Sequence, residues 1–70
     1  MMDYEIKKTY IKEHKNLIEV TIVFRYEGTL FYQEFMMSKI AYKDKEFLKQ
    51  FYDDTLPRKA RRILNETTPF

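Results

Sequence analysis

The feature that most constrains the fold of this chain is an alternating run that leads into its only glycine. Over residues 18–26, apolar side chains recur at every second position, and all of them are β-branched or aromatic. This period predicts a strand with one buried face. Glu27 and Gly28 follow, and a two-residue hairpin turn needs positive φ, which glycine adopts without a Cβ clash. The predicted buried face comprises Ile18, Val20, Ile22, Phe24 and Tyr26.

The two-residue turn also fixes the register of the next strand. A slip of one residue would move every side chain to the other face of the sheet. In the register set by the turn, one face is nearly continuously apolar, interrupted by Gln33 opposite Ile22. This agreement supports the hairpin. The other predicted pairs on this face are Tyr26–Thr29, Phe24–Phe31, Val20–Phe35 and Ile18–Met37.

An earlier strand is predicted over residues 3–12, followed by a three-residue loop that ends in Asn16. Asparagine is the best residue after glycine for the left-handed end of such a loop. The result is a three-stranded antiparallel meander. With this loop the inward pairs are Tyr10–Val20, Ile6–Phe24 and Tyr4–Tyr26, interrupted by Lys8. A two- or four-residue loop would instead bury Lys7, Thr9 and Ile11, which is a poorer set.

After the hairpin the apolar period becomes that of a helix. Asp44 is a good N-cap for a helix over residues 44–55, and Ser38 is an alternative start. The residue before a proline disfavours the helical conformation, so the helix is expected to end before Pro57. Pro57 then opens a second helix over residues 57–64. The apolar positions of the two helices are Ile40, Ala41, Phe47, Leu48, Phe51 and Tyr52, then Ala60, Ile63 and Leu64.

The predicted fold is α+β, with the order β-β-β-α-α and the helices packed on one sheet face. A length of 70 residues suits one small domain. We expect that domain to span residues 1–66 and a frayed C-terminal tail to span residues 67–70.

The amino-acid composition argues against several classes of protein. The absence of cysteine argues against disulfide scaffolds, zinc ribbons and thiol catalysis, and favours a cytoplasmic location. Residues 1–8 hold no apolar segment, so no signal peptide is expected, and no apolar run is long enough to span a membrane. We expect no cofactor and no metal ion.

Catalysis has little support among the side chains. The only histidine, His14, lies in a polar hairpin loop, where a general base has neither a cleft nor a partner. Ser38 is more plausible as a helix cap than as a nucleophile. Asp53 and Asp54 are helical neighbours, which diverge by about 100° and do not converge on a ligand. We therefore expect no enzyme activity.

The sharpest charged feature is the predicted helix over residues 57–64. It carries three of the four arginines, and guanidinium groups suit phosphate or carboxylate. Three hypotheses stand: a solvated face paired with nearby acids, a nucleic-acid contact, and a contact with an acidic protein. The candidate residues are Arg58, Lys59, Arg61 and Arg62.

The sheet face away from the helices is a second candidate surface. A solvated sheet face is normally polar, whereas this one mixes apolar, aromatic and charged residues, as interfaces do. The simpler alternative is a face covered by the chain itself. An outer strand is also open to pairing with a partner strand or a second copy. The candidate partner-binding residues are Val23, Arg25, Leu30, Tyr32 and Met36, beside Leu17 and, on the first strand, Ile11.

The sequence thus favours a small non-catalytic module that binds another protein. Residues with AT-rich codons are abundant, since Phe, Tyr, Met, Ile, Asn and Lys together make up 33 of the 70 residues. Small size and this bias suit an accessory or inhibitor protein of a phage or mobile element that binds a host protein. The alternative is a nucleic-acid-binding module that uses residues 57–64, and a homodimer is a third hypothesis.

Overall fold

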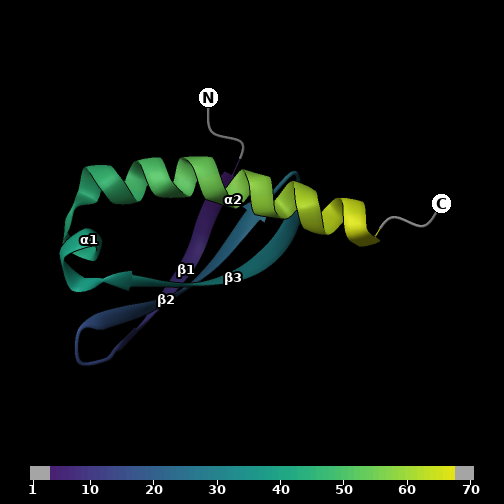
Figure 1. Cartoon of the computed structure of the whole chain (residues 1–70). Coiled ribbons are helices and arrows are strands. Elements are labelled where there is room, and N and C mark those ends of the chain that lie inside the picture. Colours follow the sequence, from purple (N-terminus) through teal and green to yellow (C-terminus); the bar gives the residue numbers. More distant parts are fainter. Residues whose placement is uncertain (1–3, 68–70) are drawn as a thin grey trace.

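The computed structural model describes residues 4–67, which form three strands followed by two helices (Figure 1). The predicted tail at residues 67–70 begins at the last residue of the second helix, and residues 68–70 lie outside the described part. The elements are β1 (Tyr4–Glu13), β2 (Leu17–Tyr26), β3 (Thr29–Ser38), α1 (Lys39–Lys43) and α2 (Lys45–Thr67).

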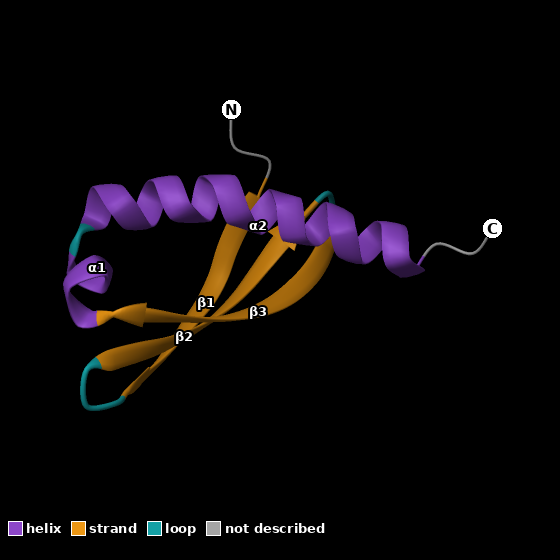
Figure 2. Cartoon of the chain, in the orientation of Figure 1, coloured by secondary structure: helices purple, strands orange, loops and turns teal. Residues whose placement is uncertain are grey.

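The strands form one antiparallel sheet in the order β1-β2-β3, which confirms the predicted meander. The long helix α2 crosses one face of this sheet (Figure 2). The short helix α1 follows β3 directly and adds Tyr42 to the same side, where its ring packs against the core. The α+β class and the β-β-β-α-α order are therefore confirmed.

The hairpin between β2 and β3 has the predicted register over its whole length. All five predicted pairs are present, from Tyr26–Thr29 at the turn to Ile18–Met37 at the far end. Both turn residues have positive φ, 50° at Glu27 and 81° at Gly28, as a type I′ turn requires. The only glycine of the chain therefore sets the register of the hairpin.

The first strand keeps its predicted register only at its start. Tyr4 lies opposite Tyr26 and Ile6 lies opposite Phe24, as expected. The pairing then shifts between Ile6 and Lys8, which is the signature of a β-bulge.

Beyond the bulge, the prediction that Tyr10 lies opposite Val20 is wrong, because Ile11 takes that position. The pairing beside the loop also differs from the prediction. Residues 14–16 lie between the two strands, as expected, but Glu13 lies opposite Ile18 and not Leu17. The His14 N–H donates to the Leu17 carbonyl at 2.9 Å. The bulge offsets this shift of one residue, so both ends of β1 still pair with β2.

The helices are divided at a different residue from the one predicted. Ser38 and Asp44, which the sequence left as alternative caps, are both used. The Ser38 hydroxyl accepts from the Ala41 N–H at 3.1 Å, and the Asp44 carboxylate accepts from the Phe47 N–H at 3.1 Å. The chain is extended at Asp44 (φ −87°, ψ 100°), which separates α1 from α2.

The prediction that Pro57 begins a new helix is wrong, because α2 continues through it. Proline inside a helix removes one backbone donor and costs about 3 kcal/mol relative to alanine. Leu56 and Ala60 on either side are both fully buried. Burying these two residues on one continuous helix face offsets the local cost.

The core lies between one face of the sheet and one stripe of α2. Central strand β2 supplies most of it, since all its inward side chains are buried. Near the start of α2 a smaller aromatic group continues the contact, where Phe35 of β3 meets Phe51 edge to face at 5.1 Å. The buried residues are Ile18, Val20, Ile22, Phe24, Tyr26, Phe31, Leu56 and Ala60.

Replacing Leu56 with alanine tests how much the sheet depends on α2. The side chain is fully buried, so Leu56→Ala is expected to lower the free energy of unfolding by about 2–5 kcal/mol in urea denaturation. Ile40→Ala is the matched control, because Ile40 is 84% exposed on α1, and its effect should stay within about 0.5 kcal/mol. Equal losses in the two variants would contradict this packing.

The turn offers a stabilising substitution. Glu27 has φ 50°, a left-handed conformation that asparagine adopts more readily than glutamate. Glu27→Asn is therefore expected to raise the free energy of unfolding by about 0.5–1 kcal/mol. Thermal unfolding measures this change. Glu5→Asn, in the extended strand β1, should not stabilise the protein, and a gain there equal to that at the turn would count against the explanation.

Candidate interaction surface

The open face is the side of the sheet turned away from α2. Its residues alternate along each strand with those that point into the core, and the pairing places them opposite one another. Within residues 4–67 both helices lie on the other side. Leu30, Tyr32 and Met36 on β3 are accordingly 56%, 60% and 55% exposed. The open face also holds Tyr10, Leu17 and Val23, with Glu5, Lys8, Lys12, Glu19, Thr21, Arg25 and Glu34.

The predicted partner-binding residues come together on this face. Val23 lies opposite Tyr32 and Arg25 lies opposite Leu30, so four of them form two adjacent cross-strand pairs. Met36 lies farther along β3, opposite Glu19. Val23 is half-buried and Arg25 is exposed. The arrangement is a row of exposed, mainly apolar side chains along β3, with Glu34 between Tyr32 and Met36, beside a more charged row on β2.

Three residues of β1 were assigned to the wrong face, Ile11 to the open face and Lys8 and Tyr10 to the helix side. Ile11 lies opposite Val20 on the helix side and is 42% exposed there. Tyr10 takes its place on the open face, opposite Thr21. The β-bulge causes this exchange, because one extra residue inverts the alternation of everything beyond it. The only signal in the sequence was the alternative of a two- or four-residue loop, which places Ile11 on the helix side.

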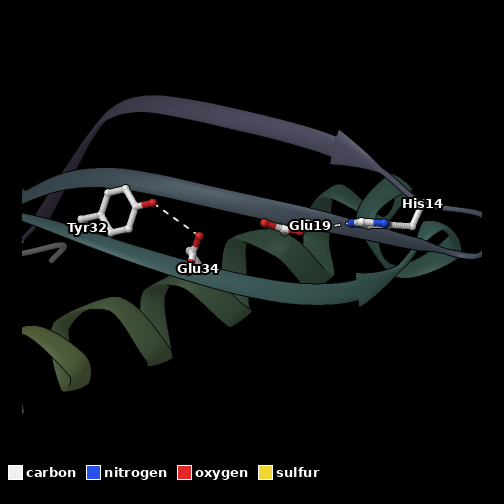
Figure 3. A network of polar contacts seen from close by, with 4 residues as sticks. All are labelled: His14, Glu19, Tyr32 and Glu34. Carbon is white, nitrogen blue, oxygen red and sulfur yellow. Dashed lines mark hydrogen bonds and ion pairs between the residues drawn. The ribbon is translucent and has the colours of Figure 1, made fainter.

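Polar side chains on the open face pair with one another rather than with α2. The Tyr32 hydroxyl donates to Glu34 at 3.4 Å, and His14 Nε2 lies 3.1 Å from the Glu19 carboxylate (Figure 3). Both contacts are exposed to solvent. Exposed contacts of this kind add little to stability, so these side chains can exchange their partners for those of a bound molecule.

The basic residues predicted at 57–64 lie on the second half of α2. Two of the arginines form ion pairs with acids one helical turn away, Arg58 with Asp54 at 2.9 Å and Arg62 with Glu66 at 3.5 Å. Arg61 is exposed and Lys59 is half-buried. The structure therefore brings the cluster together on one helix, and it also places acids among the guanidinium groups.

A polar contact on the helix side joins β1 to α2. The Tyr4 hydroxyl donates to the Asp53 carboxylate at 2.6 Å, and Lys49 lies 3.4 Å from the second oxygen. The hydrogen bond from Tyr4, followed by Lys49, lowers the pKa of Asp53. The pKa of the Tyr4 hydroxyl is raised, first by burial and then by its contact with the Asp53 carboxylate. Asp53 thus serves the packing of the helix on the sheet.

The structure offers no cluster suited to metal binding within residues 4–67, where no group of three His, Cys, Asp or Glu side chains gathers. The adjacent acids Asp53 and Asp54 point to different partners, Tyr4 and Arg58, so they do not form a paired-carboxylate site.

Comparisons add no assignment to this geometry. No family model, curated protein or solved structure matches the chain. None of the described helices is both long and apolar enough to cross a membrane.

Removing the Tyr4 hydroxyl tests the contact with Asp53. Tyr4→Phe is expected to raise the pKa of Asp53 toward its ordinary value, measured by NMR titration of the side-chain carboxyl carbon. A lowered pKa stabilises the fold above the unfolded-state pKa, and this contribution is lost as pH falls through the lowered value. The variant should therefore lose stability at neutral pH and less at strongly acid pH. Tyr10→Phe on the open face is the control, and an unchanged Asp53 pKa in Tyr4→Phe would refute the contact.

Proposed function

We propose that this protein is a small non-catalytic module that binds a partner protein through the open face. The observation that carries the proposal is the row of Leu30, Tyr32 and Met36, which is more than half exposed and lies beside Arg25. Tyrosine, methionine and arginine are enriched in protein interfaces, and charged residues form the rim around them. The expected partner surface is an apolar patch bordered by both signs of charge.

The proposal also includes a biological setting, that of a phage or mobile element in a host cell. A short chain without an evident catalytic group, rich in residues with AT-rich codons, suits an accessory or inhibitor protein of a phage or mobile element. Such a protein would act in the host cytoplasm by occupying a surface of a host protein. We propose host-protein binding as the mechanism because the open face is made of side chains suited to contact and not to chemistry.

Nucleic-acid binding by residues 57–64 is the alternative. The ion pairs of Arg58 and Arg62 reduce the net positive charge that this helix presents to a phosphate backbone. The open face offers Glu19 and Glu34, which repel phosphate. These two features make a protein the better-supported partner.

Affinity capture from an extract of the source cells tests the proposal when matched variants are compared. Tyr32→Ser with Met36→Ser should reduce recovery of the partner at least about tenfold, because two central contact residues are lost. Ile40→Ser removes a strongly exposed apolar residue from α1 and should leave recovery unchanged.

A third variant separates the two functions. Neutralising the basic cluster as Arg58→Gln, Arg61→Gln and Arg62→Gln should not alter recovery of the partner. Loss of binding in this variant, together with a steep decline of affinity with salt, would instead favour nucleic acid. Equal recovery by the wild type and the Tyr32 and Met36 variant would exclude the open face as the binding site.

A further inference from the structure

The two outer strands of the sheet differ in their protection against pairing. An edge strand exposes unpaired backbone N–H and C=O groups, and proteins block such edges with lysines, prolines or bulges. β1 carries a bulge between Ile6 and Lys8, and Lys12 lies farther along it. β3 pairs with β2 without interruption over ten residues, has no Lys, Arg or Pro, and carries Glu34 as its single charge.

We propose that β3 pairs antiparallel with β3 of a second copy, with Gln33 on the two-fold axis. The result is a continuous six-stranded sheet with both α2 helices on the same side. This inference does not depend on the proposed function, because it uses the backbone edge of β3 and not a partner protein on the open face.

The backbone of β3 is in the correct phase for this pairing. Antiparallel ladders alternate between residue pairs that exchange hydrogen bonds and pairs that do not. The pair that closes a two-residue turn, here Tyr26–Thr29, exchanges hydrogen bonds, so Thr29 directs its backbone N–H and C=O toward β2. Every second residue from Leu30 therefore directs these groups away from β2, toward the open edge of the sheet. A two-fold axis through Gln33 brings the outward groups of Tyr32 and Glu34 opposite each other.

The cross-strand side-chain pairs favour a two-fold axis at Gln33 over an axis at a neighbouring residue. With Gln33 on the axis, Tyr32 faces Glu34 of the second copy, so a hydroxyl meets a carboxylate. Apolar residues face apolar residues in the remaining positions, which are Phe31 with Phe35 and Leu30 with Met36. Cross-strand pairs of these kinds stabilise antiparallel sheets.

Neighbouring axes give poorer pairs. With Glu34 on the axis, two carboxylates face each other, which is destabilising. With Tyr32 on the axis, Glu34 faces Leu30. The axis at Gln33 also gives this polar residue a hydrogen-bonding partner. Gln33 lies opposite Ile22 and interrupts the apolar helix-side face. An amide has both donors and acceptors, so two copies of Gln33 can pair with each other.

The assembly closes at two copies. The β3 edge of each copy is used in the pairing, and the outer edges of the six-stranded sheet are then the two β1 strands, each with its bulge and lysines. An isologous interface of this kind uses the same surface on both copies, so it does not propagate into a fibre.

Sedimentation equilibrium over a range of protein concentrations tests the proposal, and a mass of about twice 8.7 kDa is expected. Glu34→Pro should weaken the dimer. Its N–H points outward, where an edge strand tolerates proline, and two symmetry-related backbone bonds are lost. The dissociation constant should rise about 10- to 100-fold. A chain that stays monomeric at the highest concentration, or a folded Glu34→Pro variant that dimerises as the wild type does, overturns the proposal.

Disulfide trapping is the second measurement, and it remains decisive if Glu34→Pro does not fold. The chain has no cysteine, so a single introduced thiol reports only on its own position. Facing side chains of a non-hydrogen-bonded pair are close enough for a disulfide, so Gln33→Cys should form a covalent dimer under mild oxidation. Thr9→Cys on β1 is the matched control and should stay monomeric. Trapping at residue 9 and not at residue 33 would refute pairing through β3.

Discussion

The structure depends on the one-sided burial of β2. This strand lies between the other two, and the side chains of its inward row are all buried, from Ile18 to Tyr26. Only Leu56 and Ala60 of α2 reach the same depth, so the helix completes a core that the sheet already organises. A chain of this length buries only about 60% of the surface it exposes when unfolded. Its apolar side chains suffice for one core between a sheet and a single long helix.

Once α2 covers one face of the sheet, the opposite face has no covering element within residues 4–67. An antiparallel sheet tolerates this arrangement when its outer side chains are polar. Here the outer row of β3 holds Leu30, Tyr32 and Met36, with Glu34 between the last two. Scattered exposed apolar residues are ordinary, but three on the outer side of one strand concentrate apolar surface on one face. That departure from the usual pattern is the physical basis for proposing a binding role for this face.

The sequence predicted those parts of the fold in which local chemistry and long-range packing agree. The hairpin from Ile18 to Met37 is one such part, because the turn at Gly28 and the alternation of both strands give the same register. In β1 a bulge inverts the alternation midway, and no proline or glycine marks its position. At Pro57 the local preference for a helix end was overridden by burial of the flanking residues. The continuous helix through Pro57 reflects burial that a single sequence does not display, and the bulge has no local marker in the sequence.

Strand β3 presents two different surfaces because side chains and backbone groups of a strand point in perpendicular directions. Its side chains alternate between the core and the open face, whereas its unpaired backbone groups lie in the plane of the sheet. Pairing of two β3 strands would therefore leave Leu30, Tyr32 and Met36 exposed and would place two copies of this row side by side. A partner protein would then meet one apolar surface twice as wide, in which the Tyr32 ring of one copy adjoins the Glu34 carboxylate of the other. The proposed dimerisation at the edge is thus compatible with the proposed binding at the face, and it would enlarge the surface available to a partner.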